Sequence, residues 1–392
     1  MKTTLYNSII SELLVHDSVT RKKMIEQFKV RPASLYSVVD ELKAQGLLCE
    51  PGRTNRRTGR KASALKFNGQ HAYFIGLDLR PRKLFGSIID LSGQVIVTQE
   101  SDFNSATSRA QLISALLTFI DDLVRQSELP ITMIQGLALA DPGLVDRDKL
   151  ISIIAVTIDN WRNIPTGQII AEHTGITNII IESGANAGTF MEYNHLKPNF
   201  PISLFNLAIG DGVGGGLVQN GEIFCGATSS GMEIGHLIVN PGGRLCQCGN
   251  RGCLETVIST PAIERKVRNL IAHGVNSKLS TDNFSLDKFI DAVKCNDKGA
   301  SSIAIELYTS IAVALQAVVA LINPEVIIIS GKLTGLGDTM LNAIRQYLAL
   351  NCQPLAVSTI KLKLASVNNF NTAQGAALLV RKKYLHHLQC KK

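Results

Sequence analysis

A short segment of this chain contains three cysteines and a histidine at a spacing that only a tightly folded loop can bring together. The residues are His236, Cys246, Cys248 and Cys253. One His and three Cys supply four soft ligands with no open position, which is the ligand set of a structural zinc site. The alternative is three unrelated buried thiols, but thiols gathered so closely would be an oxidation hazard. The sequence therefore predicts one structural zinc ion held by these four residues.

The other cysteines do not indicate a disulfide framework. Apart from the group of three, the eight cysteines are scattered, unlike those of a small secreted scaffold. The chain has 392 residues, 45% of them hydrophobic, so it can bury a large core in two or three domains. The start lacks the apolar region of a signal peptide, and the most apolar stretch, 311–322, is too short to span a bilayer. We expect a cytoplasmic protein without membrane insertion.

Positive charge is concentrated at the start of the chain. Residues 1–70 hold 13 Lys and Arg against 6 Asp and Glu, whereas the remaining residues hold 27 against 26. A surplus confined to the first fifth of a chain is the electrostatic footprint of a small nucleic-acid-binding module joined to a nearly neutral body. The expected partner of this module is operator DNA.

Three apolar stripes at helical spacing lie within residues 1–50, the third of them including Leu47. The break between the second and third stripes is only a few residues long and ends at Pro32, which suits the first turn of a helix. That is helix-turn-helix spacing, in which the second helix of the pair enters the major groove. The residues expected to reach phosphates and base edges are Arg31, Ser34, Tyr36 and Ser37.

A basic segment follows between two strand-like pieces. Its positive residues are Arg53, Arg56, Arg57, Arg60 and Lys61. So basic a loop after a helix-turn-helix predicts the wing of a winged helix, placed against the DNA backbone or minor groove. The alternative is a small helical bundle with a solvated charged loop. The helix spacing and the wing occur together, which favours DNA binding.

From about residue 72 the pattern changes to short β-rich runs that alternate with helical stretches. Such alternation predicts an α/β fold, and two successive series predict two lobes. The expected domains are a winged helix-turn-helix at 1–70, a first α/β lobe at 71–190 completed by the C-terminal helix 372–392, and a second α/β lobe with the zinc site at 191–371.

Several motifs resemble those of one family. Segment 231–255, which contains the cysteines, resembles the signature of the ROK family (repressors, open reading frames and sugar kinases). Further resemblances are ALADPGLVD at 138–146, IGDGVGGGL at 209–217 and AQGAALL at 373–379, together with TGRKASAL at 58–65, which resembles the end of the winged-helix module in the repressor branch. The resemblance implies a two-lobed, actin- and hexokinase-like (ribonuclease H-like) sugar-binding domain.

The resemblance also implies residues for a hexose. Glu233 and Glu255 match carboxylates that accept hydrogen bonds from sugar hydroxyls, and His236 matches a residue that is both zinc ligand and sugar neighbour. Ser183 stands where the family's kinases have an amide that holds the sugar. Paired acceptors beside a metal-fixed turn are physically suited to discriminate sugar epimers. Solvent-exposed carboxylates without such a role are the alternative.

Two departures from the family pattern argue against a kinase. The kinases carry Glu-Asn-Asp-Ala-Asn with the second acid as general base, whereas this chain has ESGAN at 182–186, with Gly184 at the position of the base. Their Asp-x-Gly-Gly-Thr hairpin approaches the nucleotide phosphates, but here Arg80 and Pro81 replace its two glycines. We therefore expect no enzymatic activity.

The sequence as a whole predicts a DNA-binding transcriptional regulator, a repressor of carbohydrate-utilisation genes. Its effector would be a sugar or sugar phosphate, its cofactor structural zinc, and its assembly a homodimer or a dimer of dimers. One alternative is a regulator with a decayed sugar site that is controlled by docking of a regulatory protein. The other is a ROK sugar kinase with an appended DNA-binding module.

Overall fold

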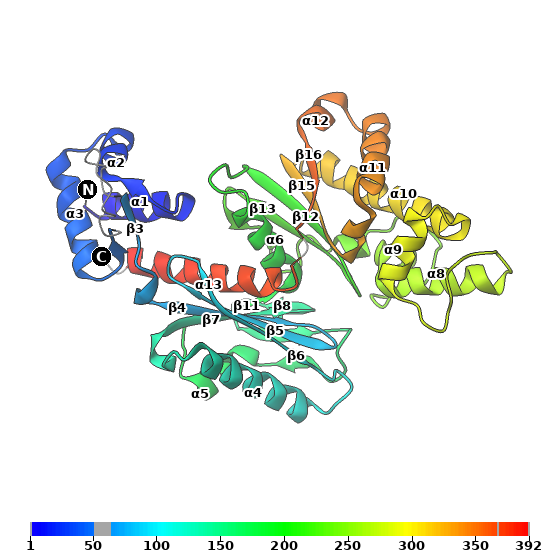
Figure 1. Cartoon of the computed structure of the whole chain (residues 1–392), viewed down its shortest axis with the longest axis horizontal. Coiled ribbons are helices and arrows are strands. Elements are labelled where there is room, and N and C mark those ends of the chain that lie inside the picture. Colours follow the sequence, from blue (N-terminus) through cyan, green and yellow to red (C-terminus); the bar gives the residue numbers. More distant parts are fainter. Residues whose placement is uncertain (1, 51–63, 367, 391–392) are drawn as a thin grey trace. The chain divides into compact units, whose positions relative to one another are not determined.

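The structure, a computed structural model, describes residues 2–50, 64–366 and 368–390 (Figure 1). It comprises two compact units. The first unit contains residues 1–200 and 370–392, and the second unit contains residues 201–369. Both units are built from sheets and helices, which confirms the predicted α/β class.

Residues 2–50 and 64–67 form the N-terminal head of the first unit, which consists of three helices and a small antiparallel sheet in the order β1-β3-β2. The elements are α1 (Lys2–Val15), β1 (Val19–Thr20), α2 (Arg21–Phe28), α3 (Pro32–Ala44), β2 (Leu48–Cys49) and β3 (Ala64–Phe67). This order of helices and strands is that of a winged helix. The five basic residues predicted for the wing, at positions 53, 56, 57, 60 and 61, lie outside the described residues.

Local sequence signals determine the turn between α2 and α3. The Thr20 hydroxyl caps α2 by accepting a hydrogen bond from the backbone N–H of Lys23 at 3.2 Å. Lys29 ends the helix in the left-handed region with a φ of 51°, and Pro32 occupies the first turn of α3 as predicted. The third stripe was extended too far, because α3 ends at Ala44 and Leu47 is buried in the turn that leads to β2.

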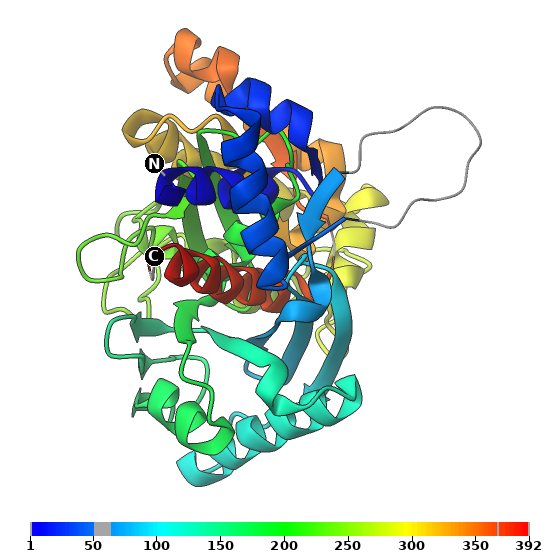
Figure 2. The same cartoon turned by 90° about the vertical axis from the view of Figure 1, so that its left-hand side faces the viewer.

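The body of the first unit is a five-stranded sheet in the order β11-β7-β4-β5-β6. Its strands are β4 (Tyr73–Leu79), β5 (Lys83–Asp90), β6 (Val95–Asp102), β7 (Ile134–Asp141) and β11 (Ile179–Ser183). Strand β4 is antiparallel to β5 and parallel to β7. Helices α4 (Arg109–Ser127) and α5 (Thr166–Thr174) cover one face, and α13 (Asn371–Cys390) covers the other (Figures 1 and 2).

Shorter elements complete this unit. They are η1 (Gly69–His71), η2 (Ile131–Met133), β8 (Leu144–Asp146), β9 (Ile151–Ile154), β10 (Arg162–Ile164) and α6 (Gly184–Asn194). Strands β8, β9 and β10 form a small antiparallel sheet of their own in the order β10-β9-β8. Trp161, the chain's one tryptophan, lies just before β10 and is 1% exposed.

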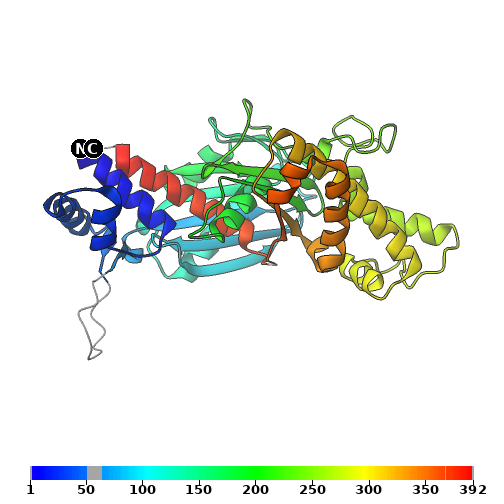
Figure 3. The ribbon, with the colours of Figure 1, turned by 90° about the horizontal axis from the view of Figure 1, so that it is seen from above.

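Helix α13 lies between the sheet and α6 because small residues permit close backbone approach. A Cβ at Gly76 in β4 would lie 1.9 Å from the carbonyl oxygen of Ala373, and one at Gly375 would lie 1.9 Å from that of Ala187 in α6. The same helix also contacts α1 of the head, and Figure 3 shows the two helices side by side. Helix α13 therefore touches the sheet, α6 and the head.

A buried charge lies where α13 meets the head. Arg381 is 2% exposed, its Nε donates to the carbonyl oxygen of Leu91 at 2.7 Å, and its guanidinium lies 5.3 Å from the ring centre of Phe67 in β3. One terminal nitrogen of Arg381 has no hydrogen-bond partner in the described part of the chain. Burial lowers the pKa of Arg381 to about 10, and the carboxylates of Asp90 and Asp17 oppose this shift.

The second unit contains a five-stranded sheet in the order β14-β13-β12-β15-β16. Its elements are β12 (Ser203–Ile209), β13 (Val213–Gln219), β14 (Glu222–Ile223), η3 (Ile234–His236), α7 (Glu255–Ile258), α8 (Thr260–Ala272), α9 (Leu286–Lys294), α10 (Lys298–Leu321), β15 (Val326–Gly331), η4 (Lys332–Leu336), α11 (Gly337–Asn351), α12 (Pro354–Thr359) and β16 (Lys361–Leu364). Its core joins the apolar side chains of β12 and β15 to those of α8, α10 and α11.

Helix α10 is long and apolar enough, by length and composition, to cross a membrane. Its buried residues, among them Leu307, Ile311 and Leu315, belong to the core of the second unit. Packing of a core helix therefore accounts for its composition.

Candidate functional site

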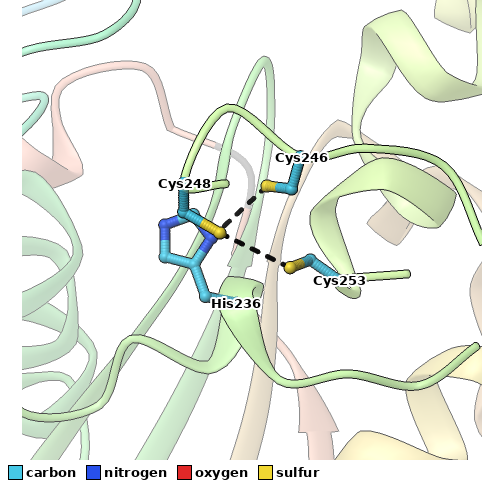
Figure 4. Close-up of side chains that lie close together, drawn as sticks. All are labelled: His236, Cys246, Cys248 and Cys253. Atoms are coloured by element: carbon cyan, nitrogen blue, oxygen red, sulfur yellow. Dashed lines mark hydrogen bonds between the residues drawn. The ribbon is translucent and has the colours of Figure 1, made fainter. Parts of the chain in front are cut away.

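Four side chains of the second unit converge on one point, as the sequence predicts. His236 ends the short helix η3, and the three cysteines come from the loop that connects η3 with α7 (Figure 4). Their ligand atoms all lie within 4.8 Å of one another. Sγ of Cys246 lies 3.6 Å from Nδ1 of His236, and Sγ of Cys248 lies 3.6 Å from Sγ of Cys253.

These distances suit a zinc ion. Tetrahedral zinc with bonds of about 2.0–2.3 Å to nitrogen and sulfur separates its ligand atoms by roughly 3.5–3.8 Å. The Cys246–His236 and Cys248–Cys253 pairs, each 3.6 Å apart, fall within that range. The four residues can therefore hold a metal, for which the Cys₃His donor set favours zinc.

Backbone hydrogen bonds shape the loop that carries the cysteines. The N–H of Cys246 donates to the carbonyl oxygen of Asn250 at 2.7 Å, and isolated bridges pair Ile238 with Cys253. Gly252 has a φ of +77°, and a Cβ there would lie 1.7 Å from the carbonyl oxygen of Asn240. Only glycine fits that position, so this residue brings Cys253 back to the other ligands.

Burial affects the thiols unequally. Cys246 and Cys253 are buried and Cys248 is exposed. Burial raises the pKa of Cys246 and raises that of Cys253 to about 12, while the backbone N–H of Asn250 lowers the pKa of Cys248. Two buried thiols with raised pKa values favour the neutral form until a cation compensates the thiolate charge, as a metal site requires.

Glu233 and Glu255 lie beside this cluster. The charge of Glu255 acts on Glu233 strongly enough to contribute to its pKa, as does that of His236. The largest effect on Glu233 is desolvation by the protein atoms around its carboxylate, which raises its pKa. The residue as a whole is nevertheless exposed to solvent. Glu255 accepts a hydrogen bond from the backbone N–H of Val213 at 3.0 Å, whereas Glu233 accepts none at its side chain from the described part of the chain.

The remaining predicted sugar residue, Ser183, belongs to the first unit and has a structural role there. It caps α6, with its hydroxyl accepting a hydrogen bond from the backbone N–H of Asn186 at 3.2 Å. Gly184 follows as the first residue of α6. A Cβ at Gly184 would make only ordinary contacts, the nearest being 3.6 Å from the carbonyl oxygen of Asp141. A side chain therefore fits at this position, but the sequence supplies none.

The hairpin between β4 and β5 is closed by its own side chains. Nε of Arg80 donates to Oδ2 of Asp78 at 2.7 Å, and a terminal nitrogen lies 2.6 Å from the same oxygen. The guanidinium also lies 4.2 Å from the ring centre of Phe85, which contacts Phe370 edge-on. Burial raises the pKa of Asp78, and Arg80 opposes that rise. Arg80 thus gives the buried Asp78 an internal partner.

Two further buried carboxylates stand in motifs quoted from the sequence but were assigned no role there. Asp141 at the end of β7 accepts hydrogen bonds from Ser152 at 2.6 Å and from the indole N–H of Trp161 at 2.8 Å. Glu182 forms an ion pair with Arg147 at 2.9 Å. An acid directly after an apolar strand was the available signal for Asp141, but the sequence gives no indication of its partners.

The four residues predicted for the recognition helix lie at or near the start of α3. Arg31, Tyr36 and Ser37 are exposed, and Ser34 is half-buried. The guanidinium of Arg21 in α2 lies 5.4 Å from the ring centre of Tyr36, so that ring already has one protein neighbour.

Comparison with known proteins agrees with this architecture. The sequence pattern of the ROK family matches residues 74–383, which is more than half of the chain. The chain belongs to the ROK family. The DNA-binding transcriptional dual regulator NagC of Escherichia coli K12 is 26% identical over 94% of this chain and 90% of its own length. The xylose repressor of Caldicellulosiruptor bescii is 23% identical over 95% of both chains.

Solved ROK structures confirm the fold. A ROK transcriptional regulator homologous to E. coli Mlc matches 100% of this chain and 97% of its own, with a TM-score of 0.82 and 23% identity. A ROK glucokinase from Streptomyces griseus, solved with glucose and AMPPNP, covers only 79% of this chain and 100% of its own, with a TM-score of 0.68 and 21% identity. ROK regulators and kinases thus share the body, and the regulators also match the chain before residue 74.

Proposed function

We propose that this chain is a transcriptional repressor of sugar-utilisation genes. The head binds operator DNA in the cytoplasm, and the ROK body binds a sugar or sugar phosphate without phosphorylating it. The observation that carries the proposal is a helix-turn-helix head joined to a ROK body in one chain. NagC and the xylose repressor align with this chain over nearly its whole length, including the head.

Two features of the first unit support regulation rather than phosphoryl transfer. Gly184 has no side chain to accept a proton from a sugar hydroxyl, so a general base is missing at that position. Arg80 and Pro81 fill the turn where a kinase of this family brings glycine backbone close to nucleotide phosphates, and Arg80 is engaged with Asp78. Each change removes a different part of the kinase machinery.

The second unit supports effector binding. Glu233 and Glu255 are neighbouring carboxylates that can accept hydrogen bonds from sugar hydroxyls, and Glu233 is influenced by the charge of His236, whose Nδ1 lies 3.6 Å from Sγ of Cys246. Zinc bound to His236, Cys246, Cys248 and Cys253 would act as a structural cross-link of the loop. The loop would then hold the sugar-binding carboxylates in place.

A continuous series of contacts supports communication within the first unit. Ser183 and Gly184 start α6, α6 packs along α13, and α13 reaches the head through α1 and Arg381. An effector that favours one arrangement of α6 and α13 would shift the population of head positions. In a homodimer or a dimer of dimers this changes the spacing of two heads relative to the half-sites of the operator.

A second candidate function is regulation by a docked protein with the sugar site decayed. Ser183 favours it, because its hydroxyl is engaged as a helix cap where the family's kinases have a sugar-holding amide. A ROK kinase with an appended head is the weaker alternative, since Arg80 and Gly184 both speak against it.

The head is tested with operator DNA selected from a random duplex pool. Replacing Arg56 and Arg57 with Glu should weaken binding to all sequences and reduce the salt dependence, whose slope is about −0.9 per phosphate contact. Changes at Ser34 or Tyr36 should alter sequence preference. Arg125→Glu, at an exposed position near the end of α4, is the charge-reversal control. If the Arg56 and Arg57 variant bound the operator as tightly as the unaltered chain, the repressor proposal would fail.

The effector function is tested by calorimetric titration of hexoses and hexose phosphates, followed by operator binding at saturating ligand. A repressor with a sugar effector should give heat with at least one of them and a changed operator affinity. Absence of heat with every sugar and sugar phosphate would contradict the sugar effector and favour regulation by a docked protein.

A further inference from the structure

The second unit contains a basic crevice behind the zinc loop, formed by Asn240, Arg244, Thr256, Arg265, Lys266, Asn269 and Glu306 around Val257. Its volume is about 240 Å³, below the roughly 300–1,000 Å³ of pockets for drug-sized ligands. The lining comes from the cysteine loop and from α7, α8 and α10. None of the predicted sugar residues lines this crevice, although one lining residue, Thr256, directly follows Glu255 in the sequence.

The charges of the basic crevice are unbalanced. It contains three cationic side chains and one carboxylate, Glu306, whose Oε1 lies 2.5 Å from Nζ of Lys266. That pair leaves Arg244 and Arg265 without a carboxylate partner in the described part of the chain. Two guanidinium groups that line one crevice repel each other unless an anion lies between them.

Arg265 is also held in place before any ligand binds. Its two terminal nitrogens donate to the carbonyl oxygens of Thr256 at 3.0 Å and Pro261 at 3.4 Å. Backbone carbonyls fix the direction of a guanidinium without neutralising its charge. The side chain therefore loses little conformational entropy when it meets an anion. Burial, and the charge of Arg244, lower the pKa of Arg265, which agrees with an uncompensated cation.

The chemistry of the lining selects the ligand. Planar guanidinium groups bind the oxygens of phosphate and carboxylate groups with paired, charge-assisted hydrogen bonds. The amides of Asn240 and Asn269 can supply further donors at the same crevice, whereas the Thr256 hydroxyl already donates to the carbonyl oxygen of Cys253 at 2.7 Å. A tetrahedral dianion offers enough acceptors for all of them, whereas a neutral sugar leaves both charges uncompensated.

We propose that the basic crevice is a binding site for a phosphate group, carried either by inorganic phosphate or by a small phosphate ester. Because Arg244 belongs to the loop that also carries the cysteines, an anion bound there ties this loop to α8. The proposal does not rest on DNA binding by the head, since the crevice lies in the second unit and includes none of the predicted DNA-binding positions.

The experiment uses the zinc-loaded full chain and measures thermal unfolding in sodium phosphate against sodium chloride of equal ionic strength. Phosphate should raise the unfolding temperature of the unaltered protein, because a ligand that binds only the native state stabilises it. Arg244→Gln and Arg265→Gln should each weaken phosphate binding on the order of tenfold, the effect of losing one charge-assisted hydrogen bond. Arg268→Gln, on the same helix but paired with Glu264, is the matched control and should keep the full shift.

Two variants keep the test decisive. Arg265 also contacts backbone, so its replacement could destabilise the fold, whereas Arg244 is exposed and its side chain makes no hydrogen bond in the described part of the chain. An equal phosphate shift in the unaltered protein and in Arg244→Gln would overturn the proposal. An equal shift in chloride would overturn it as well.

Comparison of inorganic phosphate with glucose 6-phosphate, in a Glu233→Ala background, identifies the source of the phosphate group. Similar affinity for both indicates recognition of the phosphate alone, and tighter binding of the ester indicates a phosphorylated metabolite; both results support the proposal. If Arg244→Gln weakened binding of a DNA duplex but left phosphate affinity unchanged, the crevice would contact nucleic acid and the proposal would be wrong.

Discussion

The two units treat their chemically important side chains in opposite ways. In the first unit the buried carboxylates Asp78, Asp141 and Glu182 each have partners within the protein: Arg80, the Ser152–Trp161 pair and Arg147. In the second unit the ligand atoms of His236 and the three cysteines converge on one point, and Glu233 is influenced by the charges of His236 and Glu255 but has no carboxylate-pairing cation of its own in the described part of the chain.

This difference indicates which part of the molecule can bind external ligands. A carboxylate already paired with an arginine gains little from a new ligand, because the existing hydrogen bonds must first be broken. A cluster of soft ligands or an unpaired carboxylate gains the full interaction. The acidic side chains of the first unit are therefore held by internal partners, whereas the second unit offers a cluster of ligand atoms that can still take up a metal.

The largest expected effect is at the zinc ligands. Cys248→Ser should abolish the binding of one zinc ion per chain, because structural zinc contributes apparent binding free energies of about 10–16 kcal/mol in small peptides. In this larger domain the loss should loosen the loop beside Glu233 and Glu255 and impair the effector response more than DNA affinity. Metal analysis of protein purified without chelators provides the measurement, and Cys295→Ser, an exposed thiol at the end of α9, is the control. Well-folded protein without zinc would contradict the assignment.

The next effect concerns Glu233 as an open acceptor. Glu233→Ala should weaken sugar binding by roughly 10- to 150-fold, corresponding to about 1.5–3 kcal/mol for a hydrogen bond to a charged group. DNA affinity without sugar should stay within about twofold. Operator titration with and without the hexose identified by calorimetry measures both, with the exposed Glu222→Ala as control. An unchanged sugar response in Glu233→Ala would remove this residue from the site.

A third prediction concerns an internally paired carboxylate. Asp141→Asn places an amide N–H₂ either against the backbone N–H of Gly143 or against the donors of Ser152 and Trp161, so at least one buried hydrogen bond is lost and the free energy of unfolding should fall by about 1–3 kcal/mol. The fluorescence of Trp161 reports both the local change and the urea-unfolding midpoint. Asp159→Asn, exposed and two residues from the same indole, should leave both unchanged. Equal stability of the two variants would mean that the Asp141 network is not structural.

The smallest expected effect is at Gly184. There is room for a side chain at this position, so Gly184→Asp should fold normally and restore the missing acid of the kinase pattern. General base catalysis is worth about 10²–10⁴-fold, but Arg80 and Pro81 still occupy the phosphate hairpin. ATP turnover with a panel of hexoses should therefore remain at the level of the unaltered chain. Turnover at ordinary kinase rates would show that Arg80 and Pro81 do not prevent phosphoryl transfer.

Local patterns made part of the fold and site predictable. The 3.6-residue periodicity and the Thr20 and Pro32 signals predicted the helix-turn-helix because helix boundaries depend on neighbours in sequence. The C-x-C-x₄-C spacing predicted the convergence of the thiols, because a short loop with glycines can reach only a few arrangements. The end of α3 was predicted too late. Leu47 is buried although it lies outside the helix, and an apolar residue at helical spacing does not reveal whether the helix itself extends that far.

The sequence by itself determined the cluster of one histidine and three cysteines, the basic start of the chain, the α/β body and the absence of a side chain at Gly184, because each depends on residue type or on short spacing. Only the tertiary structure decided that Arg80 binds Asp78 and that Asp141 accepts a hydrogen bond from Trp161, 20 residues away. It also placed Arg381 of the last helix against Phe67 of the head. It also decided that Arg244 and Arg265 line one crevice. Electrostatic partners are chosen by three-dimensional proximity and burial, and neither is encoded in the spacing of charges along the chain.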